Sequence, residues 1–197
     1  SETTAAATGQ GACFLSLQAP PDVKDVVLGA GGVLDATASG GAIIDLSTNS
    51  PILVRELCAT AAEKGVGFLD APVSGGQIGA EQGTLTIMLG GVDSDYQRVR
   101  GLLDCYARKH ALIGPPGHGQ YAKMVNQICI AGLVEALSEG IHFAKKAGLD
   151  VEAVMETISK GAAGSWQMEN RWKTMREGKF DFGFAVDWMR KDLSICL

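Results

Sequence analysis

The stretch "FLDAPVSGGQIGAEQGTLTIMLGG", residues 68–91, decides the fold of this chain. It opens as an apolar, strand-like run, breaks into Ser74, Gly75 and Gly76, and resumes as a second apolar run at 84–89. Glycine has no side chain to cover the backbone, so a strand that ends in glycines leaves its N–H groups accessible. We therefore expect a loop at 74–76 and a close approach to its backbone.

The composition is that of an ordinary globular protein. The chain has 197 residues, of which 46% are hydrophobic and 20% charged, and its formal net charge is −5. With no basic run, this charge argues against nucleic acid or an anionic membrane as a partner. No stretch approaches the roughly 18 uninterrupted apolar residues of a membrane helix, and the first residues do not resemble a signal peptide. The five scattered cysteines predict neither a disulfide framework nor a metal site, so we expect a cytoplasmic protein.

The first half of the chain alternates strand-like runs with helical segments. Strands are expected at 12–18, 41–48, 66–73, 84–91 and 109–114. Helices are expected between them, at 20–29, 50–65 and 93–107. Such an alternation predicts an α/β fold with a mostly parallel sheet that is covered on both faces. The direction of the run at 84–91 stays open at this point.

After "GPPGHG" at 114–119 the pattern becomes entirely helical. A long helix is expected at about 120–146, and shorter ones follow at 150–161, 165–178 and 185–197. We therefore predict a partial α/β domain at 1–117 and an all-α domain at 118–197. Both ends look cut, because no G-x-G-x-x-G turn opens the sheet and no stop signal ends the last helix.

Lys123 has an unusual place in the predicted long helix. At 100° per residue it lies on the apolar side of the helix, and the charged residues lie on the opposite side. Its expected neighbours on the apolar side are Ile130, Val134, Leu137 and Ile141, and the opposite side carries Glu135, Glu139 and His142. A lysine in this position extends to solvent at the helix end, or it is held in a cleft beside an amide.

Four segments, taken together, resemble one family. "DLSTNSP" at 45–51, the stretch at 68–91, "GHGQYAKMVNQ" at 117–127 and "RKDL" at 190–193 have the order and spacing of the β-hydroxyacid dehydrogenases. In this family, which includes 3-hydroxyisobutyrate dehydrogenase, a Rossmann-type NAD(P)-binding domain is joined by a long helix to an all-helical domain that usually mediates dimerisation. A 6-phosphogluconate dehydrogenase would carry histidine where this chain has Asn126.

The resemblance implies a role for each substrate-side residue. Lys123 matches the catalytic lysine, which would exchange the hydroxyl proton with the substrate. Asn126 would hold the substrate hydroxyl or carboxylate and position Lys123, and Gln127 is the alternative holder. The segment Ser74-Gly75-Gly76 would bind the substrate carboxylate through its backbone and the serine hydroxyl.

On the cofactor side, the resemblance implies that Ser47 and Thr48 contact the nicotinamide or its ribose and that Lys191 reaches the cofactor. Asp192 looks structural, and Ser50 is expected to cap a helix that begins at Pro51. The cofactor is NAD or NADP, and the sequence does not choose between them.

The sequence therefore predicts an oxidoreductase that transfers a hydride between NAD(P) and a small β-hydroxy acid or its semialdehyde. A homodimer or higher homo-oligomer is expected. Because the glycine-rich turn that normally binds the dinucleotide phosphates is not in the sequence, we also expect weak cofactor binding. The alternative is an impaired fragment that folds, self-associates and binds carboxylates without turnover.

Overall fold

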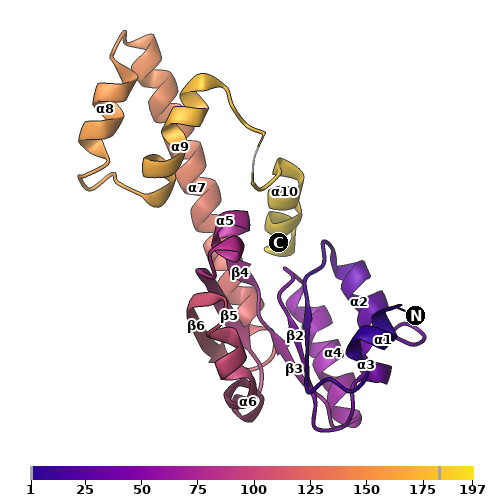
Figure 1. Ribbon diagram of the computed structural model, residues 1–197. Coiled ribbons are helices and arrows are strands. Elements are labelled where there is room, and N and C mark those ends of the chain that lie inside the picture. Colours follow the sequence, from indigo (N-terminus) through magenta and orange to yellow (C-terminus); the bar gives the residue numbers. More distant parts are fainter. Residues whose placement is uncertain (1, 182) are drawn as a thin grey trace. The chain divides into compact units, whose positions relative to one another are not determined.

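The computed structural model describes residues 2–181 and 183–197, and it contains an α/β unit and a helical unit (Figure 1). The α/β unit extends to Met124 and also includes Ser194–Leu197, and the helical unit is Val125–Leu193. The boundary between the two units falls within the long helix, between Met124 and Val125, a few residues beyond the boundary predicted at 117. A Rossmann-like, mostly parallel sheet followed by a helical region is the fold that the sequence predicts.

In the described residues the α/β unit contains a single six-stranded sheet. Its strands are β1 (Ala12–Leu15), β2 (Ala42–Asp45), β3 (Gly67–Asp70), β4 (Val73–Ser74), β5 (Leu85–Gly90) and β6 (Ala107–Gly114). β1, β2 and β3 are parallel neighbours, and β5 is parallel to β6 but antiparallel to β3 and β4. The chain between β3 and β5 forms β4 and one short helix, and β4 pairs with β5 in the antiparallel direction. This answers the open question of the direction of the run at 84–91.

Helices cover both faces of the sheet. They are α1 (Glu2–Ala7), α2 (Pro20–Leu28), α3 (Val33–Ala36), α4 (Pro51–Glu63), α5 (Gly76–Glu81) and α6 (Asp93–Leu103). Successive strand residues point to opposite faces, so Ile43 packs in one core with residues of α2, α3 and α4. Its neighbour Ile44 packs in a second core with Val99 and Leu103 of α6. Two buried faces explain why these strands are apolar throughout.

The glycine-rich segment differs from the expected loop. Ser74 ends β4, and α5 begins at Gly76. Gly75 has a φ of 132°, which side chains rarely allow, so the turn between β4 and α5 requires glycine there. The helix was not predicted because "GQIGAE" has weak helix propensity. Gly79 lies close to Leu85 of β5, since a Cβ at this position would be 3.3 Å from the leucine side chain. The cap of α4 is as predicted, since Ser50 Oγ accepts from the Ile52 N–H at 3.2 Å.

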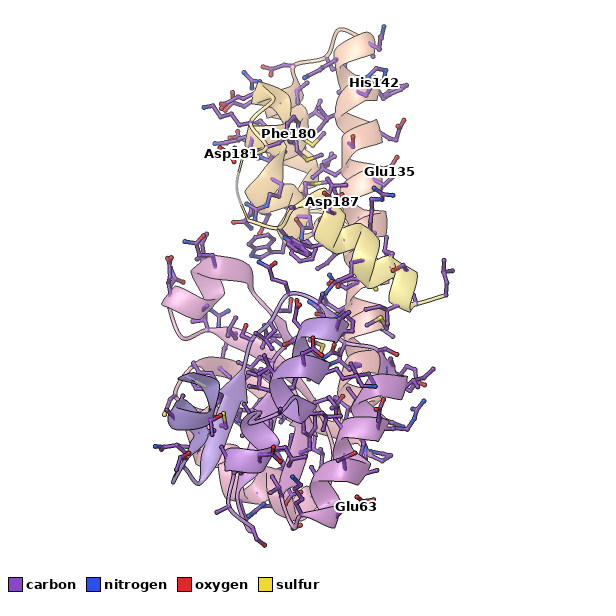
Figure 2. The ribbon with its side chains drawn as sticks, turned by 90° about the vertical axis from the view of Figure 1, so that its right-hand side faces the viewer. Glu63, Glu135, His142, Phe180, Asp181 and Asp187 are labelled. Carbon is purple, nitrogen blue, oxygen red and sulfur yellow. The ribbon has the colours of Figure 1, made fainter. Side chains whose placement is uncertain are left out.

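Beyond β6 the described chain is helical. Its helices are α7 (His118–Lys146), α8 (Val151–Ile158), α9 (Trp166–Glu177) and α10 (Val186–Ile195). In the helical unit the C-terminal half of α7 packs on α8 and α9 through a shared core of Leu137, Ile141, Ala144, Val151, Met155, Met168 and Trp172. Glu135 and His142 project outward from α7 (Figure 2). Val134, which was expected on the buried side, is 36% exposed, because the core formed with α8 and α9 begins only at Leu137.

Gly119 marks the point where α7 starts against the sheet. A Cβ at this position would meet the backbone carbonyl oxygens of Met88 and Asp70, the latter at 2.8 Å. We predict that Gly119→Ala lowers the free energy of unfolding by about 1–3 kcal/mol, because neither backbone oxygen can move aside cheaply. Urea unfolding measures the difference.

The matched control is Gly101→Ala in α6, where a Cβ would meet nothing within 4 Å. There alanine should be neutral or stabilise by up to about 1 kcal/mol through its helix propensity. Equal effects of the two substitutions would contradict the close approach at Gly119.

Candidate active site

Two buried carboxylates mark the ends of adjacent strands. Asp45 ends β2, Asp70 ends β3, and the two residues are partners in the parallel register. Neither residue is exposed to solvent. In open α/β sheets, ligands bind outside the carboxyl ends of the strands, which is this edge. The candidate site therefore begins at these two residues.

Asp70 caps the first turn of α7. Its Oδ1 accepts from the Gly117 N–H and its Oδ2 from the Gln120 N–H, each at 2.9 Å. A carboxylate is favoured here because a helix N-terminus carries unpaired N–H groups and a partial positive charge. Burial raises the pKa of Asp70, and the backbone donors, Gly117 first, oppose this shift. The cap fixes the first turn of the helix that carries Lys123.

The Gln120 side chain joins α7 to the segment that follows β2. Its Oε1 accepts from the Asn49 N–H at 2.9 Å, and its Nε2 donates to the Ser47 carbonyl at 2.9 Å. Asp70, Gln120 and Asn49 were not identified from the sequence. The one available signal was an acidic residue that closes an otherwise apolar strand, at Asp45 and again at Asp70.

The Lys123 side chain lies next to the start of the glycine-rich segment. Its side chain is buried, with the residue only 7% exposed, and Nζ donates to the Val73 carbonyl at 2.8 Å. Val73 directly precedes Ser74 in β4. The ammonium is therefore held beside the Ser74–Gly76 segment and does not extend to solvent.

Ser47 and Thr48 differ in accessibility. Ser47 is buried, its Oγ accepts from the Leu17 N–H at 2.8 Å, and its N–H donates to Asp45 Oδ1 at 3.0 Å. Thr48 is half-buried. Ser47 therefore ties the ends of β1 and β2 together, and Thr48 is the more accessible hydroxyl of the two.

The remaining predicted site residues meet in the helical unit. Asn126 Nδ2 donates to Gln127 Oε1 at 2.8 Å, and Gln127 Nε2 donates to Asp192 Oδ2 at 2.7 Å. Lys191 Nζ forms an ion pair with Asp192 Oδ1 at 3.1 Å. The structure thus groups Ser47, Thr48, Ser74–Gly76 and Lys123 in the α/β unit, and it groups Asn126, Gln127 and Lys191 in the helical unit.

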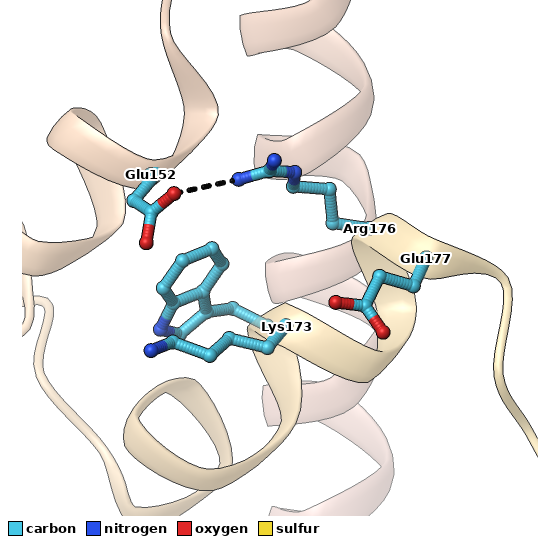
Figure 3. Close-up of a pocket in the computed structure, with 5 residues that line it drawn as sticks. Glu152, Lys173, Arg176 and Glu177 are labelled. Atoms are coloured by element: carbon cyan, nitrogen blue, oxygen red, sulfur yellow. Dashed lines mark hydrogen bonds and ion pairs between the residues drawn. The ribbon is translucent and has the colours of Figure 1, made fainter.

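A separate polar hollow of about 80 Å³ lies in the helical unit (Figure 3). It is lined by Glu152, Trp172, Lys173, Arg176 and Glu177. Glu152 and Arg176 pair with each other at 3.1 Å across it. None of the predicted site residues lines this hollow, and among the described residues no cluster of three or more His, Cys, Asp or Glu side chains could hold a metal ion.

Family comparisons cover nearly the whole chain. Residues 1–114 match the model of the NAD binding domain of 6-phosphogluconate dehydrogenase. Residues 117–197 match the model of the NAD-binding domain of NADP-dependent 3-hydroxyisobutyrate dehydrogenase.

Individual relatives agree with these matches. An oxidoreductase of Shewanella frigidimarina is 53% identical over 98% of the chain, and the 2-hydroxy-3-oxopropionate reductase of Escherichia coli is 38% identical over 93%. The chain spans 66% and 63% of the lengths of these two proteins. The 3-hydroxyisobutyrate dehydrogenase of Mycobacterium tuberculosis superposes with a TM-score of 0.86 at 30% identity, over 98% of this chain and 68% of that one.

The fold and the two family matches define the class as proteins with the NAD(P)-binding fold of the dehydrogenases. Within this class, the chain belongs to the β-hydroxyacid dehydrogenase family. The family and the cofactor class predicted from the sequence, NAD or NADP, are thereby confirmed.

Asp45 gives the α/β unit a predictable pH dependence. Burial raises the pKa of Asp45 to about 6, hydrogen bonds from Ser47 and Asn49 oppose the shift, and the charge of Asp70 adds to it. Because the folded-state pKa lies above the unfolded one, the stabilising contribution is fully present below the ordinary pKa of 3.8 and is lost as the pH rises through about 6. This loss is on the order of 2–3 kcal/mol.

We predict that Asp45→Asn, which does not titrate, flattens the pH dependence of the free energy of unfolding between about pH 4 and pH 7. Urea unfolding at a series of pH values provides the measurement. The exposed Asp22→Asn in α2 is the control and should keep the wild-type slope. An unchanged slope in Asp45→Asn would show that Asp45 is already ionised at low pH.

Proposed function

We propose that the chain takes part in hydride transfer between NAD(P) and a small β-hydroxy acid or its semialdehyde, with Lys123 as the proton-transfer group. The observation that carries this proposal is the buried Lys123 ammonium, which lies 2.8 Å from the Val73 carbonyl at the start of the Ser74–Gly76 segment. A buried cation beside accessible backbone N–H groups suits a ligand that has both a carboxylate and a polar carbon–oxygen bond.

Each step of this chemistry has a residue to perform it. The bound nicotinamide supplies or takes up the hydride. During reduction Lys123 donates a proton to the carbonyl oxygen, and during oxidation it accepts the hydroxyl proton. The Ser74 hydroxyl and the backbone of Gly75 and Gly76 bind the carboxylate, because glycines leave these N–H groups uncovered.

The cofactor-side residues fit a nucleotide. Thr48 offers a half-buried hydroxyl, and Lys191 offers an ammonium whose side chain is 22% exposed. Hydroxyl donors and a cation suit the ribose, the carboxamide and the phosphates of a dinucleotide. Ser47 supports this edge through its bonds to Leu17 and Asp45.

The names of relatives support the substrate class. They include a 2-hydroxy-3-oxopropionate reductase, a 2-(hydroxymethyl)glutarate dehydrogenase and an NAD-dependent L-serine dehydrogenase. All three names describe short carboxylic acids with a hydroxyl, hydroxymethyl or carbonyl group. We propose a substrate of the same kind for this chain, and we propose that it acts in the cytoplasm.

We predict that Lys123→Met lowers the rate of hydride transfer by about 10²–10⁴-fold, because it removes the proton-transfer group and keeps the length of the side chain. The absorbance of reduced nicotinamide follows turnover with a panel of β-hydroxy acids. Calorimetric titration with NAD and NADP measures cofactor binding, which Lys123→Met should leave unchanged.

Lys146→Met is the matched control, because Lys146 is an exposed lysine in the last turn of the same helix. It should turn over at the wild-type rate. A wild-type chain that binds hydroxy acids without turnover would contradict the proposed activity, and equal losses in both variants would contradict the role of Lys123.

We also propose that the chain forms a homo-oligomer through α7. One side of this helix exposes apolar side chains, including Val125, Ile128 and Phe143, and on the same side a Cβ at Gly132 or Gly140 would meet nothing within 4 Å. Small residues among apolar ones allow a second helix to approach closely, and an exposed apolar stripe favours association.

Of the described helices, α7 also has the length and composition of a membrane span, with 22% of that window buried. Core helices of soluble proteins meet the same criterion.

We predict that Ile128→Glu shifts the chain toward the monomer, because a charge in the apolar stripe would lose its water on association. Sedimentation velocity at several protein concentrations gives the association state. Ile52→Glu in α4 is the control, since Ile52 is even more exposed, 73% against 55%, and lies outside the helical unit. A wild-type chain that is monomeric at all concentrations would rule out this interface.

A further inference from the structure

The side chains of Asn126, Gln127, Asp192 and Lys191 are linked one to the next in the helical unit, by two hydrogen bonds and an ion pair. Gln127 and Asp192 are the buried members of this series, and each is at most 2% exposed. Asn126 and Lys191 are its partly exposed ends. The two ends are the residues proposed for the substrate and the cofactor, and the middle belongs to the protein interior.

We propose that Asp192 is a positioning residue that sets which atom of Asn126 faces the substrate. This inference rests on the proposed function of Asn126. It gives Asp192 a role beyond the structural one expected from the sequence. It also assigns Gln127, the alternative substrate holder, to the support of Asn126.

The orientation follows from the hydrogen-bonding inventory of each group. An ionised carboxylate only accepts, so Asp192 requires the Nε2 of Gln127 to point toward it. The Oε1 of Gln127 then points toward Asn126 and requires the Nδ2 of Asn126 as its donor. Asn126 is left with Oδ1, an acceptor, and with the second N–H of Nδ2. One acidic residue thus fixes the direction of both amides, which alone could flip.

An acceptor at this position selects the chemistry of the ligand. The Oδ1 of Asn126 can receive a hydrogen bond from a substrate hydroxyl, but it repels a carboxylate. A hydroxyl can donate to Oδ1 and also accept from the second N–H, whereas a carboxylate can use only that N–H, so the substrate hydroxyl is the better partner for Asn126. This resolves the choice between hydroxyl and carboxylate that the sequence left open for Asn126, in favour of the hydroxyl.

The two carboxylate oxygens of Asp192 have different partners, one proposed for the substrate side and one for the cofactor side. Oδ2 accepts from Gln127, whereas Oδ1 pairs with Lys191. The ion pair with Lys191 engages Oδ1 and leaves Oδ2 as the acceptor for Gln127. Lys191 thereby contributes to the substrate side without contacting Asn126.

Asp192→Leu tests the inference, because leucine has a similar volume but no acceptor. NMR measures hydrogen exchange of the side-chain amides of Asn126 and Gln127 in the full 197-residue chain. The expected result is that hydrogen exchange at both amides accelerates about tenfold or more. Without Asp192 the Gln127 amide loses its acceptor, and Gln127 then no longer holds its Oε1 toward Asn126. Asp192→Asn keeps an acceptor oxygen and should hold the Asn126 exchange rate within about threefold of wild type.

Asp187→Leu is the matched control, since Asp187 lies on the same helix with an 86% exposed side chain, and it should change neither amide. Gln127→Met removes the link between Asn126 and Asp192 and should accelerate exchange at Asn126 even if Asp192→Leu fails to fold. An unchanged Asn126 amide in Gln127→Met, or in a folded Asp192→Leu, would overturn the proposal.

A second readout tests the consequence for specificity. We expect the wild-type chain to bind 3-hydroxyisobutyrate about tenfold or more tightly than isobutyrate, which lacks the hydroxyl, and Asp192→Leu to lose this preference. A preference that survives in Asp192→Leu would overturn the assigned role. If the wild-type chain binds neither acid, the proposed function fails, whereas the exchange measurements still decide whether Asp192 orients the two amides.

Discussion

The buried carboxylate of Asp70 is the interaction on which the α/β unit depends. It joins the end of β3 to the first turn of α7 by accepting from the N–H groups of Gly117 and Gln120. The joint is possible only because glycine occupies two positions around it. A Cβ at Gly90 would lie 2.5 Å from Asp70 Oδ1, and one at Gly119 would lie 2.8 Å from Oδ2. Asp70, Gly90 and Gly119 are far apart in the sequence, but their packing against one another makes this contact possible.

This joint links the stability of the fold to the geometry of the candidate site. Burial makes both Asp45 and Asp70 harder to ionise, so the strand ends carry a free-energy cost at neutral pH. Backbone and side-chain donors offset part of that cost, and the same donors fix the start of α7 and the segment after β2. Lys123 is one turn further along α7, where its ammonium meets the Val73 carbonyl.

Local signals in the sequence identified most elements of the fold. The cap at Ser50, the apolar runs that became β2, β3 and β5, and the helical spacing after residue 117 all predicted structure correctly, because each depends on neighbours in the chain. The direction of β5, the helix α5 and the cap by Asp70 were not predicted. The cap joins residues 47 and 50 positions apart, and no local pattern records such a contact. For the site, the helical wheel placed Lys123 on the inner side of α7, but it could not show that Gln120 or Asp192 would serve as a partner.

Asp70 in the α/β unit and Asp192 in the helical unit illustrate a common physical principle. A carboxylate accepts and never donates while it is ionised, so it determines the direction of every group that it binds. Asp70 directs backbone N–H groups, whereas Asp192 directs a side-chain amide that would otherwise have two equivalent orientations. In each unit, a buried carboxylate thus sets the direction of the hydrogen-bonding groups around it.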